Sequence, residues 1–197
     1  MITIGLTGSI AMGKSETAKM FRSLDVPVFD ADEAVHKLYA RNGGAVKPVG
    51  ALFPAAIEDG AVNRVTLAKL VLNDTQALKD LENLVHPLVQ KERQKFIDQA
   101  NNEGRALIVL DIPLLFETGG EEQVDKIVVV SASEEIQRER ALQRPGMTEE
   151  KFEAILRKQV PDHEKRAKAD FVVDSSHGLA AAKAQVVDIV QTLLNTQ

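Results

Sequence analysis

Short apolar runs rich in β-branched residues alternate along this chain with longer stretches of helical periodicity. Gly, Pro, Asp or Ser bounds each run, which is typical of parallel strands covered by helices on both faces. The predicted strands are Ile2 to Thr7, Val26 to Phe29, Ala106 to Leu110, Ile127 to Val130 and Phe171 to Val173. The pattern therefore predicts an α/β fold of three layers, α/β/α, around a five-stranded parallel sheet.

The first strand is followed at once by a helical pattern. Thr17, Met20, Phe21 and Leu24 fall at i, i+3, i+4 and i+7, which places one apolar stripe toward the sheet. The amino-terminal segment is thus a strand, loop and helix unit. At the other end of the sequence, a helix from about Ala180 to Leu193 is the last predicted element.

Residues 31–103 show helical periodicity and no run comparable to the five strands, and they are too long for a simple crossover. Asp74 is placed to cap a helix, and Pro87 is expected to kink or end it. We interpret this stretch as a helical lobe attached to the sheet.

Residues 133–169 are dense in Arg, Lys, Glu and Gln, and Pro145 with Gly146 divides them into two predicted helices. A charged helical hairpin has little apolar surface to bury, so we expect a mobile lid. The chain is therefore predicted to be a single domain of 197 residues. Its core comprises residues 1–30, 104–132 and 170–197, with the lobe at 31–103 and the lid at 133–169.

Composition narrows the class of protein. Apolar residues make up 44% and charged residues 27% of the chain, as in ordinary globular proteins. There is no cysteine, which excludes disulfides, thiolate metal sites and a thiol nucleophile. The net charge of −5 argues against nucleic acid or membrane as partners. The first apolar run lacks a basic leader and ends at a glycine-rich turn, so we expect a cytoplasmic protein.

The segment Gly8 to Ser15 satisfies the pattern GxxxxGK[ST], directly after a predicted strand and before a predicted helix. Free backbone amides and the positive end of the helix would surround a polyphosphate. Lys14 would reach the β- and γ-phosphates, and the Ser15 hydroxyl would help bind Mg²⁺. The alternative is a glycine turn that only caps a helix. The chain lacks an NKxD base-recognition element and an LSGGQ transporter motif, which favours a small-molecule kinase.

Three aspartates follow predicted strands, at the edge where open α/β sheets bind ligands. Asp30 and Asp32 end the second run, and one of them, with Asp32 preferred, could accept a proton from an attacking hydroxyl. Both could equally cap the next helix. Asp111 ends the third run and could hold Mg²⁺, or be an ordinary strand-end residue.

Two lid arginines, Arg140 and Arg144, are four residues apart and would share a helix face. Either could approach the transferring phosphoryl group when the lid closes. The alternative is a solvated helix face. His86, beside Pro87, stands out among the histidines, although no neighbouring residue gives it metal-binding spacing.

Taken together, these segments resemble the dephospho-coenzyme A kinase family over nearly the whole chain. The similar segments are the nucleotide loop, the Val28 to Asp32 element, Asp59 to Leu67, Leu84 to Leu88, Asp111 to Glu117, Arg140, Arg144, Gln159, and Lys165 to Asp174. The departures are Ala11, where the family often has Gly, Glu16, where it often has Thr, and Pro54, where it often has Gly.

The resemblance implies ATP-dependent phosphorylation of the ribose 3′-hydroxyl of dephospho-coenzyme A, the last step of coenzyme A biosynthesis, with Mg²⁺. It implies that Asp32 is the base and that Lys14, Arg140 and Arg144 carry phosphoryl charge. By the same likeness, the nucleotide is bound by Gly8, Ala11, Met12, Gly13, Lys14, Ser15, Glu16 and Arg144. Dephospho-coenzyme A would contact Asp32, Arg64, His86 and Leu115, and the metal would contact Ser15 and Asp111.

Two rival functions stay open at this stage. One is another P-loop phosphotransferase, acting on a nucleoside monophosphate or a small alcohol. The other is a regulatory protein that binds ATP without transferring phosphate. The sequence does not decide between a monomer and a weak homo-oligomer.

Overall fold

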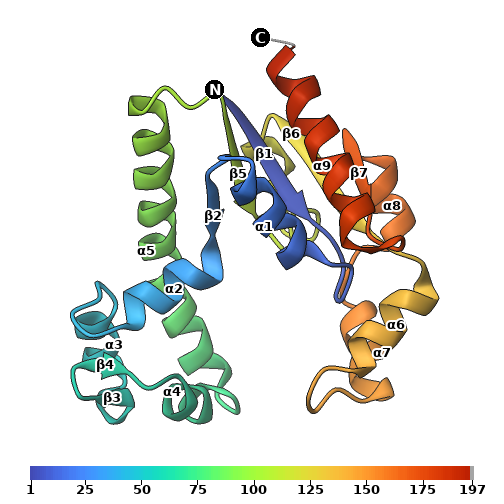
Figure 1. The fold of residues 1–197 in the computed structure, drawn as a ribbon. Helices are drawn as coiled ribbons and strands as arrows, with labels where there is room; N and C mark the ends of the chain where they lie inside the picture. The colour runs from blue at the N-terminus through green and yellow to red at the C-terminus, as the bar shows by residue number, and fades with distance from the viewer. Residues whose placement is uncertain (196–197) are drawn as a thin grey trace. The chain divides into compact units, whose positions relative to one another are not determined.

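The computed structural model describes residues 1–195, and its chain contacts divide it into two compact units. The core unit comprises Met1–Phe29 and the chain from Ala100 onward, and the helical lobe comprises Asp30–Gln99. Both are drawn in Figure 1. The segment predicted as a lid belongs to the core unit.

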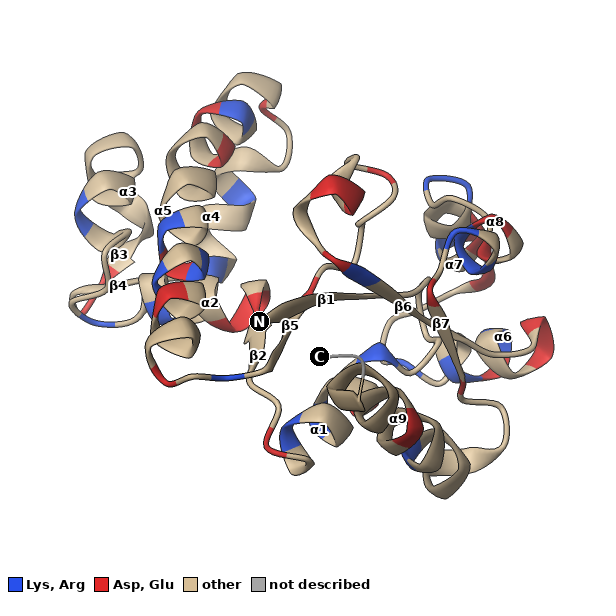
Figure 2. Ribbon diagram, turned by 90° about the horizontal axis from the view of Figure 1, so that it is seen from above, with Lys and Arg blue, Asp and Glu red and all other residues tan. Residues whose placement is uncertain are grey.

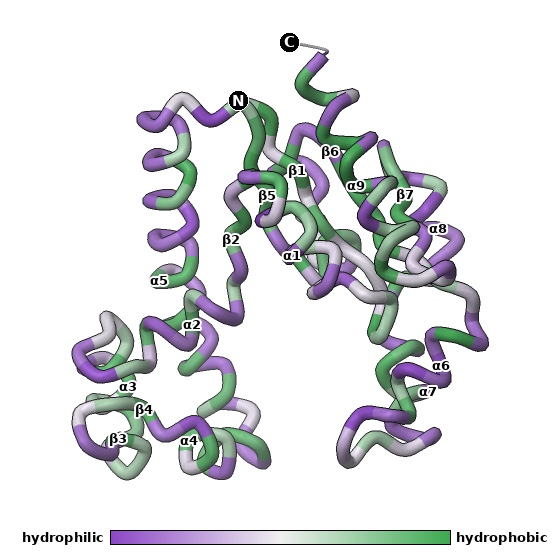
Figure 3. The backbone as a smooth tube through the Cα atoms, in the orientation of Figure 1, coloured by the Kyte–Doolittle hydropathy of each residue, from purple (hydrophilic) through white to green (hydrophobic). Residues whose placement is uncertain are grey.

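A parallel five-stranded sheet forms the centre of the core unit, as predicted, with the strand order β2-β5-β1-β6-β7. The central strand β1 lies between β5 and β6, where Leu6 is beside Asp111 on one side and Val128 on the other. The strands are β1 (Ile2–Thr7), β2 (Val28–Asp30), β5 (Leu107–Asp111), β6 (Lys126–Ser131) and β7 (Phe171–Asp174). The central strands β5 and β6 are hydrophobic along most of their length (Figure 3), as expected for strands buried on both faces.

Alternate side chains of the strands serve two different clusters. On β6, Val128 and Val130 join the main cluster with α1 and α9, whereas Ile127 and Val129 join a second cluster with Leu115 and Phe116. Because successive strand residues point to opposite faces, these clusters mark the two sides of the sheet. The three-layer arrangement follows.

The helices of the core unit follow the predicted order, with η2 and α8 as additions. They are α1 (Lys14–Ser23), the 3₁₀ helix η2 (Gly120–Gln123), α6 (Glu134–Leu142), α7 (Glu149–Leu156), α8 (Asp162–Ala167) and α9 (Gly178–Asn195). Pro145 and Gly146 separate α6 from α7 as predicted, but a third helix, α8, follows Pro161. Acidic and basic residues are interspersed along α6 to α8 (Figure 2).

The helical lobe has an apolar cluster of its own, which includes Leu38, Val49, Leu67 and Val85. Its elements are α2 (Ala31–Tyr39), α3 (Val46–Leu52), η1 (Pro54–Ala56), β3 (Ile57–Glu58), β4 (Ala61–Val62), α4 (Arg64–Val71) and α5 (Thr75–Asn102). Asp74 caps α5 as predicted, because its Oδ1 accepts hydrogen bonds from the amides of Gln76 and Ala77.

Two features of the lobe differ from the simplest expectation. Of the two alternatives for Pro87, an end to the helix is wrong, since α5 runs through it for 28 residues. Val85 is buried, and Leu88 packs against the same cluster, so packing on both sides of the proline favours a continuous helix. The lobe also contains strands: β3 and β4 pair antiparallel across Asp59 and Gly60, which have φ angles of 51° and 76°. An Asp-Gly pair with two positive φ angles is a favoured hairpin turn.

No helix among residues 1–195 is long and apolar enough to cross a membrane.

Candidate functional site

The loop between β1 and α1 has the backbone that the GxxxxGK[ST] pattern predicts. A Cβ atom on Gly8 would lie 2.6 Å from the carbonyl oxygen of Val130 on β6, so only glycine fits there. Gly13, the N-cap residue of α1, has a φ of 96°, a conformation that side chains with a Cβ rarely adopt. The backbone of the loop therefore requires glycine at positions 8 and 13.

Ala11, the departure from the family's usual glycine, has a left-handed φ of 62°. This conformation costs a residue with a Cβ roughly 1–2 kcal/mol. The Ala11 side chain is buried and belongs to an apolar cluster with Ala141 and Phe152 of the lid segment. Burial of one methyl group contributes about 0.8 kcal/mol, which offsets part of that cost.

The start of α1 presents free amides to the loop. The Thr17 amide donates to the carbonyl of Gly13, so Lys14, Ser15 and Glu16 make up the first helical turn. Amides of a first turn have no carbonyl four residues earlier in the helix, and the helix dipole adds partial positive charge. The site therefore suits a phosphate group.

Lys14 and Asp111 form an ion pair beside the loop. The Asp111 side chain is 6% exposed and that of Lys14 is 17% exposed. Lys14 follows the carboxyl end of β1, and Asp111 ends the adjacent strand β5, so the parallel sheet brings them together. Each charge neutralises the other in this structure. Lys14 is the residue that the sequence analysis proposed for the phosphates, and Asp111 is the one that it proposed for the metal.

The residues after Lys14 are on the surface. Ser15 is exposed, and the carboxylate of Glu16 pairs with Lys19 at 2.6 Å, which offsets the negative charge that Glu16 brings to the loop. Within residues 1–195 no group of three His, Cys, Asp or Glu side chains could hold a metal ion alone. Ser15 and Asp111 offer hard oxygen atoms, which suit Mg²⁺ when substrate phosphates and water complete its shell.

Arg140 on α6 is held against the loop through a residue that the sequence analysis missed. Its Nη1 donates to Ser175 Oγ and its Nη2 to the Ser175 carbonyl, each at 2.8 Å. Ser175 Oγ in turn donates to the carbonyl oxygen of Met12 at 2.7 Å. Ser175 follows β7, a strand end of the kind that binds ligands in such sheets, and that position could have drawn attention to it.

Arg144 does not share a helix face with Arg140. Helix α6 ends at Leu142, and Arg144 lies beyond the C-cap residue Gln143 with an exposed side chain. The prediction assumed that the helix reached Pro145. A residue before proline is disfavoured in the helical conformation, which explains the earlier end.

The two acidic residues after β2 have different surroundings. Asp30 Oδ1 accepts a hydrogen bond from the Glu33 amide at 3.0 Å and caps α2. Asp32, in the first turn of α2, is exposed, and its carboxylate has no partner within the described residues. The capping alternative therefore applies to Asp30, and Asp32 is left with a free carboxylate.

The other predicted substrate contacts differ in exposure. Arg64 begins α4 and His86 lies within α5, and both are exposed in the helical lobe. Leu115 is wholly buried in the cluster with Phe116, Ile127 and Val129. Its side chain has no surface to offer a ligand, so we leave Leu115 out of the proposed site.

A buried ion pair connects the segment after β5 to α8. Lys165 Nζ lies 2.8 Å from Glu117 Oε1, with the Lys165 side chain wholly buried and that of Glu117 11% exposed. The same oxygen accepts a hydrogen bond from the Val160 amide at 2.9 Å. Burial alone would raise the pKa of Glu117, but the contacts with Lys165 and Val160 hold this pKa below its ordinary value.

Replacement of Glu117 by glutamine is expected to lower the free energy of unfolding at pH 7 by about 3 kcal/mol, because Lys165 loses its buried counter-ion. A carboxylate with a lowered folded-state pKa stabilises the protein above its unfolded pKa, and this contribution is lost as the pH falls through the folded value. The difference between wild type and Glu117→Gln should therefore shrink below about pH 4. Urea unfolding at pH 7 and at about pH 3, below the ordinary pKa of a glutamate, measures it, with the exposed Glu122→Gln as control. Equal stability of the wild type and Glu117→Gln at pH 7 would contradict this account.

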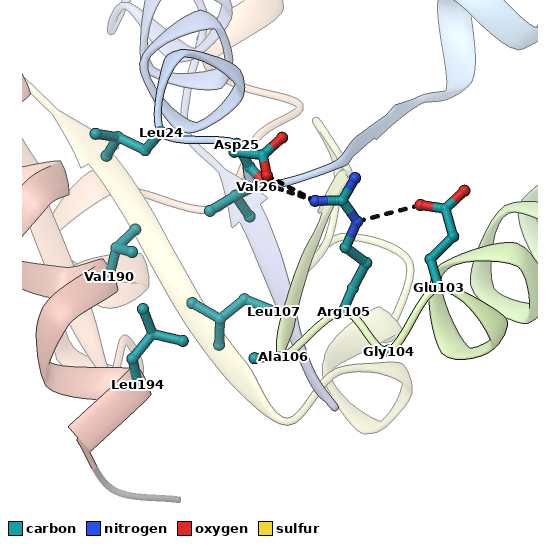
Figure 4. Close-up of a pocket in the computed structure, with 10 residues that line it drawn as sticks. All are labelled: Leu24, Asp25, Val26, Glu103, Gly104, Arg105, Ala106, Leu107, Val190 and Leu194. Carbon is teal, nitrogen blue, oxygen red and sulfur yellow. Dashed lines mark hydrogen bonds and ion pairs between the residues drawn. The ribbon is translucent and has the colours of Figure 1, made fainter.

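A hollow lies at the end of the strands opposite to the GxxxxGKS loop (Figure 4). Leu107 at the start of β5 and Val190 with Leu194 on α9 line it. Arg105 at its edge is paired with Asp25 at 2.8 Å and Glu103 at 3.1 Å. Because both acidic groups already neutralise this arginine, the hollow does not compete with the loop as a phosphate site.

The parallel α/β sheet carries a GxxxxGKS loop that begins a helix, with a lysine and a strand-end aspartate beside it, and these features define a P-loop nucleotide-binding protein. A sequence model described as "Dephospho-CoA kinase" matches residues 2–181. The chain therefore belongs to the dephospho-CoA kinase family.

Individual relatives agree with this assignment. The chain is 55% identical over 193 residues to the dephospho-CoA kinase of Mesorhizobium japonicum, which covers 98% of this chain and 97% of that protein. It is 54% identical to the enzyme of Agrobacterium fabrum, with 98% of each chain covered. The crystal structure of TT1252 from Thermus thermophilus has a TM-score of 0.78 at 34% identity and covers 97% of this chain and 96% of its own. Dephospho-CoA kinase from Campylobacter jejuni has a TM-score of 0.72 at 25% identity, with the same coverage.

Proposed function

We propose that this protein transfers the γ-phosphoryl group of ATP to the ribose 3′-hydroxyl of dephospho-coenzyme A, which yields coenzyme A and ADP. The observation that carries the proposal is the phosphate-binding loop with Lys14 and Asp111 paired beside it. Family membership supports the choice of acceptor.

In this proposal the loop amides and Lys14 bind the phosphate groups. A triphosphate would compete with Asp111 for the Lys14 ammonium, since both are anionic. Arg140 would add positive charge to the phosphoryl group as negative charge builds up in the transition state. Its contact with Ser175, next to Met12 of the loop, supports this role. Arg144 keeps an exposed, movable side chain that could also reach a phosphate.

Asp32 is proposed as the general base that accepts the proton of the 3′-hydroxyl during attack on the γ-phosphorus. Its carboxylate is exposed and unpaired within the described residues, whereas Asp30 is occupied as a helix cap. Arg64 and His86 are proposed to bind dephospho-coenzyme A, and their exposure in the lobe supports this role. A positively charged Arg64 suits an anionic substrate.

Mg²⁺ is proposed to accompany the nucleotide, with Ser15 and Asp111 as its protein ligands. When bound, it would supply positive charge to the phosphate groups. The Asp111 carboxylate would become available to it once Lys14 turns to the phosphates.

The decisive experiment incubates the protein with ATP, Mg²⁺ and dephospho-coenzyme A and detects coenzyme A by its mass. We expect one phosphate to be added per molecule of ATP consumed. Parallel reactions with nucleoside monophosphates test the rival phosphotransferase. Turnover of a monophosphate without turnover of dephospho-coenzyme A would overturn the proposal, and ATP binding without any transfer would favour the regulatory rival. A cytoplasmic location stays a prediction.

A further inference from the structure

The peptide groups of one loop residue, Ile10, are held by two glutamines of the lid segment. The Ile10 amide donates to Gln159 Oε1 at 3.0 Å, and Gln137 Nε2 donates to the Ile10 carbonyl oxygen at 2.8 Å. Gln137 is on α6 and is 5% exposed, whereas Gln159 follows α7. One contact therefore comes from the α6 arm of the α6–α7 hairpin and the other from the segment that follows α7.

The orientation of each glutamine amide is fixed by its partner. The Ile10 amide can only donate, so Gln159 must present its oxygen, and the Ile10 carbonyl can only accept, so Gln137 must present its nitrogen. The contacts are consequently not interchangeable. A carboxylate could replace the oxygen of Gln159, but it could not replace the nitrogen of Gln137.

The apolar contacts of the same residues reinforce the connection. Ile10 packs against a cluster formed by Ala11, Ala141 and Phe152, and Phe152 of α7 is 2% exposed. The hairpin therefore buries more apolar surface than its charged sequence suggested. The core of this hairpin includes residues of the phosphate-binding loop, so a displacement of the hairpin must either carry Ile10 with it or break two hydrogen bonds.

Because its hydrogen bond goes to the hairpin, the Ile10 amide differs from the amides that are available to bind phosphate. It is directed to Gln159, while the amides in the first turn of α1 have no helical partner. Ile10 is thus the residue at which the hairpin holds the loop. The loop residues after Ile10 form the phosphate-binding curve, the part of the loop that would surround the phosphate. Ala11, next in sequence, has an unfavourable φ. If the hydrogen bonds of Ile10 are lost, the phosphate-binding curve can therefore relax to a less strained conformation.

We propose that Gln137 and Gln159 are positioning residues for the nucleotide. By holding both peptide groups of Ile10, they keep the phosphate-binding curve in shape and couple it to the placement of the α6–α7 hairpin. This inference rests on the proposed function only in that the loop binds ATP; it does not depend on the acceptor.

The test compares variants that keep or lose each hydrogen bond, with ATP·Mg²⁺ binding to the full chain measured by calorimetry. Gln137→Met and Gln159→Met remove the contacts without adding charge, and each should weaken binding about tenfold, because a polar group of Ile10 loses its partner. Gln159→Glu retains the acceptor and should bind at least about threefold more tightly than Gln137→Glu, which places a carboxylate against a carbonyl. The exposed Gln143→Glu, on the same hairpin, should match wild type.

The outcomes separate the alternatives. Wild-type binding by Gln137→Met, or equal binding by Gln159→Glu and Gln137→Glu, would overturn the inference. If the buried Gln137 variants fail to fold, the comparison of Gln159→Met with Gln159→Glu decides it, since only the second keeps the acceptor. A role confined to folding would lower the melting temperature and leave the KM for ATP unchanged, whereas we expect the KM for ATP to rise more than the KM for dephospho-coenzyme A. Absence of ATP binding by the wild type would refute the proposed function instead.

Discussion

Replacement of Lys14 by methionine is expected to lower turnover by roughly 10²–10³-fold, because the site loses the ammonium that would stabilise the phosphates. Methionine has a similar length but no charge. The change also removes the ion pair with the buried Asp111 carboxylate. We therefore expect lower stability as well, so steady-state rates should be measured well below the melting temperature of the variant.

Lys183→Met is the matched control for Lys14→Met. Lys183 lies on α9 and its side chain is exposed. A surface substitution of this kind changes stability little, so this variant should retain wild-type turnover. Turnover of folded Lys14→Met within about threefold of wild type would remove Lys14 from the proposed mechanism, which assigns it charge stabilisation.

Asp32→Asn is expected to reduce turnover by about 10²–10⁴-fold and to leave ATP affinity nearly unchanged. The substitution preserves size and removes the negative charge together with the ability to accept the proton. Because Asp32 is exposed and unpaired within residues 1–195, the fold should be little affected. Single-turnover rates with ATP in excess, together with calorimetric ATP binding, separate the chemical step from nucleotide binding.

Two neighbouring acidic residues serve as controls for Asp32. Glu33→Gln removes a charge from the same helical turn, where Glu33 pairs with Lys37 at 2.8 Å, and it should preserve turnover. Asp30→Asn should preserve the cap of α2, since asparagine is as good an N-cap as aspartate. If Asp30→Asn lost turnover while Asp32→Asn did not, the base would have to be reassigned to Asp30.

Local patterns made most of the core unit predictable. The strand predictions rest on apolar runs that both faces of the sheet bury, and the loop prediction rests on glycines whose backbone has no substitute. The ion pair of Lys14 and Asp111 was not predicted, although the sequence placed both residues at or after the carboxyl ends of strands that proved to be neighbours. Strands and loops of this kind can be predicted from the sequence because the burial of a strand and the geometry of a loop each depend on few residues.

The missed features depend on contacts between distant parts of the chain. Helix α5 passes through Pro87 because lobe residues on both sides of it pack into a common cluster. The hairpin of β3 and β4 has two residues in each strand, too few for an alternating pattern, although Asp59 and Gly60 signal its turn. The contacts of Ile10 with Gln137 and Gln159 span 127 and 149 residues, and no local pattern predicts them.

The glycine that opens the loop is constrained by a neighbour unrelated to the nucleotide. The carbonyl oxygen of Val130, which leaves no space for a Cβ on Gly8, belongs to β6 of the central sheet. A side chain on Gly8 is therefore expected to disturb the packing of the loop on the sheet whether or not a nucleotide is bound. Loss of activity in a Gly8 variant would thus report on folding before it reports on nucleotide binding.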